Sequence, residues 1–121
     1  VILDTSFILT CIKEKIDFLD AENFGNLILP LQVIKELEKL AEGRERKERE
    51  NAILALRIIE KNKNNFKIIS LEKKFTDAGI KKFLEGKKNI AVATLDRDLK
   101  RELKGKARIL TLRAGKKVSL D

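Results

Sequence analysis

The sequence predicts an α/β fold, a three-layer α/β/α sandwich with a central parallel sheet, formed as a single domain over residues 1–121. Short apolar runs alternate with segments whose apolar residues recur at helical spacing, which is typical of a parallel sheet covered on both faces. The length of 121 residues is that of one domain. Hydrophobic residues make up 43% and charged residues 38% of the chain, as in folded proteins.

The first half of the chain is expected to form two strands and three helical segments. Val1-Ile2-Leu3 predicts a buried strand, and apolar residues then recur at helical spacing over residues 8–19. A second strand is expected over residues 27–29. Pro30 favours a helix start, with an apolar stripe over residues 33–41. Residues 42–51 are almost wholly charged and predict an exposed, partly helical connection, before the helical pattern resumes over residues 53–59.

The second half repeats the alternation with shorter segments. A strand over residues 66–71 precedes a helix that Thr76 could cap and Gly86 could end. The clearest strand covers residues 89–95, followed by a short helix over residues 98–104. The last strand, residues 108–113, is expected to turn at Ala114-Gly115 into a hairpin with residues 118–120.

The composition excludes several kinds of site. Without His, the chain cannot form a Ser-His-Asp triad or a His-ligated zinc site, and the single Cys11 excludes an internal disulfide. Catalysis would then fall to carboxylates, cationic groups or a metal with oxygen ligands, which are the ligands that Mg²⁺ and Mn²⁺ prefer. No apolar run approaches the ~20 residues of a membrane span, and the acid after Leu3 argues against a signal peptide. We therefore expect a cytoplasmic protein without a membrane partner.

Two acids directly follow apolar strands, where ligands of open α/β sheets bind. Asp4 follows the first strand and Asp96 follows the strand over residues 89–95, so parallel central strands would bring the two together. Thr5, Ser6 and Asp98 lie beside them in the sequence. The alternative is that each Asp caps the helix that follows it.

Helical spacing gives further candidates. Asp77 lies about 60° from Ile80, close to the apolar face, where a carboxylate needs a partner or a cation. Its alternative role is to complement the helix dipole. Glu36 and Glu38 flank the apolar stripe of their helix almost symmetrically, so periodicity does not choose between them.

Four motifs together resemble a PIN domain, in the expected order and over essentially the whole chain. They are Val-Ile-Leu-Asp4-Thr-Ser, Pro30-Leu-Gln-Val-Ile-Lys-Glu36-Leu, Thr76-Asp77-Ala-Gly-Ile80 and Ala93-Thr-Leu-Asp96-Arg-Asp98-Leu. The segment from Thr94 and the closing Leu112-Arg-x-Gly-Lys look like the branch with the eukaryotic small-subunit rRNA-processing nuclease.

The resemblance implies an endoribonuclease that depends on Mg²⁺ or Mn²⁺ and cleaves single-stranded RNA, leaving 5′-phosphate and 3′-hydroxyl ends. By position, the catalytic and metal-binding quartet would be Asp4, Glu36, Asp77 and Asp96, which selects Glu36 over Glu38. Asp98 would be a further metal ligand. Thr5, Ser6 and Thr94 match hydroxyls that support the site.

The net charge of +8 fits an RNA substrate. The candidate RNA-binding residues follow two of the acids in sequence: Lys81, Lys82, Lys87, Lys88, Lys100, Arg101 and Lys104. Two alternatives are a toxin-type ribonuclease controlled by an antitoxin and a catalytically inactive RNA-binding scaffold. Other expected partners are a ribosome-assembly factor and, from the apolar surface of the long helices, a second copy of the chain in a homodimer.

Overall fold

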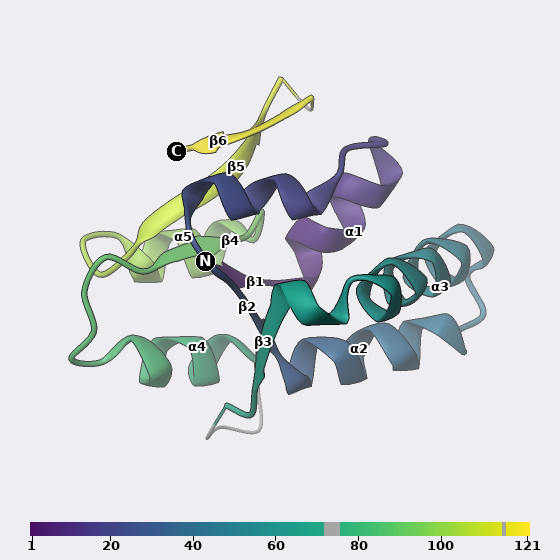
Figure 1. The fold of residues 1–121 in the computed structure, drawn as a ribbon, viewed down its shortest axis with the longest axis horizontal. Coiled ribbons are helices and arrows are strands. Elements are labelled where there is room, and N and C mark those ends of the chain that lie inside the picture. Colours follow the sequence, from purple (N-terminus) through teal and green to yellow (C-terminus); the bar gives the residue numbers. More distant parts are fainter. Residues whose placement is uncertain (72–75, 115) are drawn as a thin grey trace.

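The computed structural model describes residues 1–71, 76–114 and 116–121, and it contains a six-stranded sheet with the strand order β3-β2-β1-β4-β5-β6 (Figure 1). The strands are β1 (Ile2–Leu3), β2 (Leu27–Pro30), β3 (Phe66–Ile69), β4 (Ala91–Ala93), β5 (Arg108–Arg113) and β6 (Lys117–Leu120). All neighbouring strands are parallel except β5 and β6, which form the expected antiparallel hairpin. Gly115, in the expected turn of this hairpin, lies outside the described residues.

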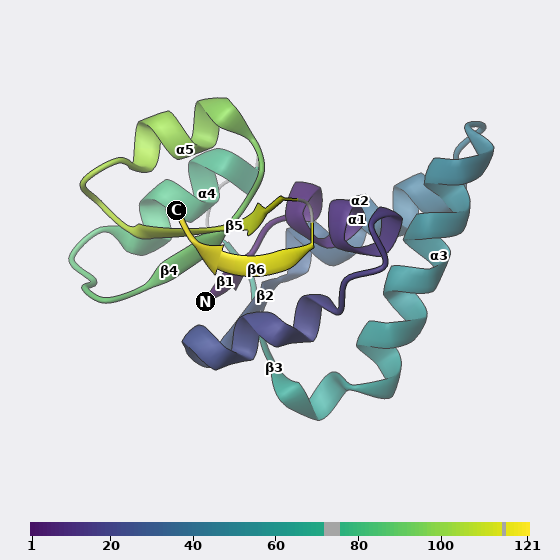
Figure 2. The same ribbon diagram turned by 90° about the horizontal axis from the view of Figure 1, so that it is seen from above.

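Helices lie on both faces of the sheet, as the sequence predicts. The α-helices are α1 (Thr5–Lys13), α2 (Leu31–Ala41), α3 (Arg46–Lys61), α4 (Thr76–Leu84) and α5 (Arg97–Leu103), and two 3₁₀ segments are η1 (Phe18–Phe24) and η2 (Lys63–Asn65). Figure 2 shows α4 and α5 together on one side of the sheet. In the described part of the chain, no helix is long and apolar enough to cross a membrane.

The alternation of side chains along the central strands separates two cores. Leu3 and Ala93 belong to the core formed with α1, η1, α2 and α3. Ile2 and Val92, one residue earlier on each strand, belong to the core formed with α4 and α5. Because successive strand residues face opposite sides, a strand as short as β1 contributes to both cores.

The order of the strands creates a switch point between β1 and β4. From β1 the chain moves outward to β2 and β3, and after α4 it returns to the other side of β1 and continues outward to β5. The helices of the two halves therefore cover opposite faces. In such sheets a crevice opens at the carboxyl ends of the two strands where the direction reverses, which here are the ends of β1 and β4.

Several element boundaries differ from the sequence prediction. The strand expected over residues 66–71 ends at Ile69, and the helix expected over residues 53–59 already starts at Arg46. Two further differences have a cause in the backbone. The single helix expected over residues 8–19 is wrong: α1 starts at Thr5 and ends at Lys13, because Lys15 adopts a left-handed conformation with φ of 60°. Asp17 then starts η1 by accepting a hydrogen bond from the Leu19 amide. The strand expected over residues 89–95 covers only Ala91–Ala93, since Asn89 also has a positive φ of 62°.

Helix α4 is held against the sheet through Leu71. The Gln32 side chain pairs with both main-chain groups of Leu71: its Nε2 donates to the carbonyl at 2.8 Å, and its Oε1 accepts from the amide at 3.0 Å. On the other side of Leu71, a Cβ added at Gly79 of α4 would lie 2.7 Å from the Leu71 Cβ. Close packing at Gly79 therefore sets the distance between α4 and Leu71.

Replacement of Gly79 by Ala is expected to lower the free energy of unfolding by about 1–3 kcal/mol, because the new methyl group overlaps Leu71. Ala also brings a gain of about 1 kcal/mol in helix propensity, so the net loss is expected toward the lower part of this range. Urea denaturation checks it, with Lys82→Ala on the exposed side of α4 as the control. A Gly79→Ala variant at least as stable as the wild type would show that α4 does not need this close contact.

Candidate metal-binding carboxylate site

Asp4 is buried at the carboxyl end of β1, with only 5% of its surface exposed. Its amide continues the sheet ladder by donating to the Ala93 carbonyl at 3.0 Å. Its Oδ2 accepts hydrogen bonds from the hydroxyls of Thr94, at 2.7 Å, and Ser6, at 3.0 Å. Asp4 occupies the N-cap position of α1, yet its side chain makes no capping hydrogen bond. Capping therefore does not explain this buried acid.

The same two hydroxyls connect Asp4 to the turn that carries Asp96. Thr94 Oγ1 accepts from the Asp96 amide, and Ser6 Oγ accepts from the Leu95 amide, both at 3.1 Å. Asp96 does cap its helix: its Oδ1 accepts from the amides of Asp98 and Leu99 at 2.9 and 3.1 Å. Its second oxygen has no hydrogen-bond donor within the described ranges, so Asp96 can cap α5 and still offer a ligand atom.

Glu36 connects the first turns of two other helices. Its Oε2 accepts a hydrogen bond from Thr5 Oγ1 of α1 at 2.7 Å, and its Oε1 accepts from Thr76 Oγ1 of α4. Glu38, two residues further along α2, is exposed. The structure thus places Glu36, and not Glu38, at the carboxyl edge of the sheet. Sequence reasoning treated Thr76 only as a helix cap, although its position beside Asp77 could have drawn attention to it.

Asp77 lies in the first turn of α4, half-buried, at the same edge. Burial raises the pKa of this carboxyl from 3.8 to about 6, and neighbouring acids add to the rise. In decreasing order of effect these acids are Asp4, Asp96, Glu36 and Glu102. Burial also raises the pKa of Asp4, and the charge of Glu36 adds to it. The four acids that the resemblance implies are therefore close enough to repel one another.

The chemistry of this edge fits a hard divalent cation. In the described part of the chain none of the four acids forms an ion pair with Lys or Arg, so nothing there neutralises their charge. Asp98 differs, because it is exposed and its Oδ1 lies 3.2 Å from Arg101 Nη2. Carboxylate oxygens are the ligands that Mg²⁺ and Mn²⁺ prefer.

The described residues contain no group of three His, Cys, Asp or Glu side chains already arranged to hold a metal ion. Glu36 has both of its oxygens engaged by threonine hydroxyls, and Asp96 has one engaged by main-chain amides. The acids thus share an edge without converging on one point, and binding a common ion requires their side chains to move closer together.

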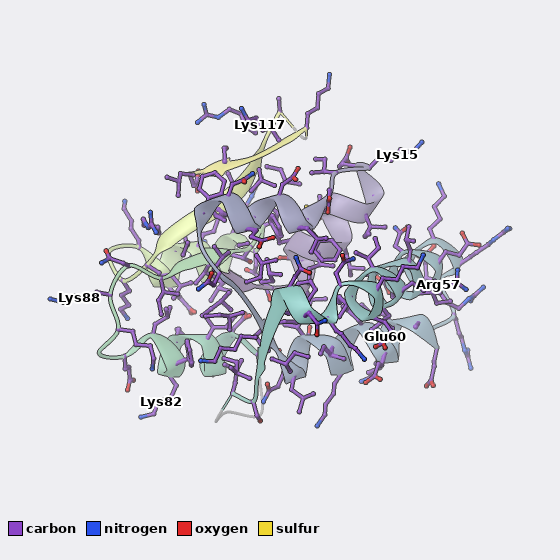
Figure 3. All side chains as sticks on the ribbon, viewed as in Figure 1. Lys15, Arg57, Glu60, Lys82, Lys88 and Lys117 are labelled. Atoms are coloured by element: carbon purple, nitrogen blue, oxygen red, sulfur yellow. The ribbon has the colours of Figure 1, made fainter. Side chains whose placement is uncertain are left out.

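The candidate RNA-binding residues do not all lie near the acids. Because α4 and α5 return toward the amino edge of the parallel sheet, their C-terminal ends carry Lys87, Lys88 and Lys104 away from the acids. Figure 3 shows Lys88 at one end of the molecule. Several of the candidates have partners: Lys81 with Glu102, Lys82 with Glu85, Arg101 with Asp98, Lys100 with Thr111 and Lys87 with the Phe83 ring and carbonyl.

Comparisons with known proteins point to one family. A family model described as a PIN like domain matches residues 1–115. Ribonuclease VapC4 of Methanocaldococcus jannaschii is 28% identical over 108 residues, which cover 85% of this chain and 81% of that protein. The solved structure of the PIN domain endonuclease Utp24 superposes with a TM-score of 0.78 and 26% identity, covering 99% of this chain and 89% of that one. The fold, the order of the acidic residues along it and these similarities agree: the chain belongs to the PIN-like domain family.

Proposed function

We propose that this protein is an endoribonuclease that cleaves single-stranded RNA with the help of Mg²⁺ or Mn²⁺ held by Asp4, Glu36, Asp77 and Asp96. The observation that carries the proposal is the set of acids at the switch point, where burial and neighbouring carboxylates raise the pKa values of Asp4 and Asp77 and no Lys or Arg of the described residues forms an ion pair with any of the four. The similarity to a ribonuclease and to a PIN domain endonuclease supports the same reaction.

Mg²⁺ or Mn²⁺ held by Asp4, Glu36, Asp77 and Asp96 would supply the acidity to activate water for attack on a phosphodiester and the charge to neutralise the phosphate. The residues around it have separate tasks. Thr94 and Ser6 hold the Asp4 carboxylate in one orientation, and Thr5 and Thr76 do the same for Glu36. These hydrogen bonds keep the Asp4 and Glu36 carboxylates at this edge of the sheet, from which the side chains have to close around an ion.

Asp77 and Asp96 would supply the remaining metal ligands, from the first turn of α4 and the N-cap of α5 on the other face of the sheet. Asp96 is fixed by the amides of Asp98 and Leu99, which leaves its second oxygen available. Asp98 is exposed and paired with Arg101, so we assign it a supporting role at the rim of the site. A site of this kind needs no His, because a bound ion would supply the acidity.

Two narrower roles remain within this proposal. The first is processing of rRNA or another RNA, and the second is a toxin-type ribonuclease whose carboxylate edge is covered by an antitoxin. A small protein that co-purifies with the chain and suppresses cleavage would favour the second role, and discrete cleavage within precursor rRNA would favour the first, in which a ribosome-assembly factor is the expected partner. An inactive scaffold is disfavoured, since RNA binding alone does not need four repelling carboxylates.

Cleavage of a fluorescent single-stranded RNA is expected with Mn²⁺ or Mg²⁺ and should disappear on chelation. We expect Asp4→Asn, Asp96→Asn and Glu36→Gln each to lower the rate by roughly 100-fold or more. Glu38→Gln is the matched control, because it removes an exposed carboxylate two residues away on the same helix and should cleave like the wild type. Cleavage that persists in the three site variants would refute the proposal.

The pKa of Asp77 predicts how stability depends on pH when no metal is present. The folded state binds the Asp77 proton more tightly than the unfolded state does. Protonation of Asp77 therefore stabilises the fold, fully below about pH 4, and this contribution is lost as the pH rises through about 6. Asp77→Asn should therefore increase the free energy of unfolding at pH 7.5 by about 1 kcal/mol, a value reduced for solvent screening at this half-buried group. The gain should vanish below pH 4.

Thermal denaturation across this pH range, with and without Mn²⁺, tests the electrostatic argument without any activity measurement. Mn²⁺ should raise the melting temperature of the wild type more than that of Asp77→Asn. If Asp77→Asn is no more stable than the wild type at pH 7.5, and Mn²⁺ shifts neither protein, the acids do not form a strained cation site.

A further inference from the structure

The net charge of this protein lies entirely in its second half. Residues 1–70 contain twelve Lys or Arg and twelve Asp or Glu, whereas residues 71–121 contain fifteen and seven. The second half carries α4, β4, α5 and the β5–β6 hairpin. An anionic polymer would therefore be attracted to one half of the molecule and not to the other.

Within this half, the cationic and the acidic side chains of α5 lie on different sides of the helix. Taking about 100° per residue, its four cations lie within an arc of about 100°, and its two acids point to one side of that arc. Contacts orient the helix: Glu102 Oε2 lies 2.9 Å from Lys81 Nζ of α4, and Lys100 Nζ donates to Thr111 Oγ1 of β5 at 3.0 Å. The acids therefore face α4, and the cations face β5 and the solvent. The cations are Arg97, Lys100, Arg101 and Lys104.

A hollow continues this basic face between α5 and β5. It has a volume of about 600 Å³, and its charged lining is provided by Lys100, Arg101, Lys104 and Arg108, with Asp121 as its one acid. Ala107 and Ile109 contribute apolar surface. Lys104 and Arg108 are exposed, and no acid of the described residues lies within ion-pair distance of either. These two cations are thus available to a ligand.

The basic face starts at the carboxylate site. Asp96 is the N-cap of α5, and Lys104 follows its last residue, so the two positions are about 12 Å apart along the helix axis. An extended strand with one phosphate at the acids could follow α5 and place later phosphates at the hollow. Among the described residues, the lining contains no aromatic side chain on which a base could stack.

We propose that the basic face of α5 and the adjoining hollow form a phosphate-binding track for single-stranded RNA, which holds the strand on one side of the cleaved bond. This inference rests on the proposed function, because it takes the carboxylate edge as the place of cleavage. The track recognises the sugar-phosphate backbone and not the bases, so binding is independent of sequence. The track adds Arg97 and Arg108 to the RNA-binding residues expected from the sequence. Lys87 and Lys88, which were among those expected residues, lie outside the track.

The test measures binding of a short fluorescent oligouridine in the presence of a chelator, so that cleavage cannot interfere. The triple variant Arg101→Gln, Lys104→Gln and Arg108→Gln removes three cations from the track. Each phosphate contact on a single strand contributes about −0.7 to the slope of log affinity against log salt, so the slope should become shallower by about 2. At about 50 mM salt the affinity should fall roughly tenfold or more.

A second triple variant removes the same number and type of charges from the electroneutral half. Lys15→Gln, Arg44→Gln and Arg57→Gln are all at exposed positions, and Figure 3 shows Lys15 and Arg57 at the other end of the molecule from Lys88. This control should keep the wild-type affinity within about twofold. An equal loss in both triple variants would overturn the track, because net charge alone would then explain binding.

Further outcomes separate the track from the function. If the track variant binds RNA like the wild type while the wild type cleaves RNA with Mn²⁺, the track is wrong and the nuclease stands. If the wild type neither binds oligouridine nor cleaves RNA, both fail. Binding of polyglutamate as tightly as RNA, with the same dependence on the three cations, would assign the face to an acidic protein and overturn the proposal. The single variants Lys104→Gln and Arg108→Gln, both at exposed positions, repeat the test if the triple variant does not fold.

Discussion

Electrostatic repulsion between carboxylates at the ends of β1 and β4 is the main constraint on this structure. Packing of α1, α2, α4 and α5 around the ends of β1 and β4 brings Asp4, Glu36, Asp77 and Asp96 to one edge, where burial and mutual charge raise the pKa values of Asp4 and Asp77. Two apolar cores, one on each face of the sheet, supply the free energy that holds these helices in place. A folded protein that keeps such an arrangement has exchanged some stability for a site that attracts cations.

Hydrogen bonds from hydroxyl groups hold the Asp4 and Glu36 carboxylates at this edge of the sheet. Thr94 and Ser6 connect the Asp4 carboxylate to the β4–α5 turn, and Thr5 and Thr76 place Glu36 between the first turns of α1 and α4. Each hydroxyl donates to a carboxylate, so it stabilises the charged form without adding a charge of its own. Lys or Arg in these positions would neutralise the acids and leave less attraction for an ion. The basic residues instead begin next to Asp96, at Arg97, and continue along α5 to Lys104, away from the acids.

The sequence predicted the sheet, the hairpin and the edge at which the acids gather, because each of these follows from local pattern. Asp4 and Asp96 could be proposed from the sequence because each directly follows an apolar strand. Glu36 and Glu38 could not be distinguished by periodicity, since both flank the apolar stripe, and it is the tertiary contact with Thr5 and Thr76 that separates them. The helix expected over residues 8–19 was wrong because a left-handed Lys15 interrupts it, a conformation that no apolar pattern reveals. Lys87 and Lys88 follow Asp77 in sequence, but a helix that runs back across the sheet carries them to its opposite edge.

We infer that the four acids close around a shared divalent cation. The most direct measurement is a crystal structure of the protein soaked with Mn²⁺, in which anomalous scattering locates the ion independently of any assumption about its ligands. We expect an anomalous peak between the carboxylates of Asp4 and Asp96, with Glu36 and Asp77 closer to that point than they are without the ion. No peak at this edge, or a peak only at acids elsewhere on the surface, would contradict it.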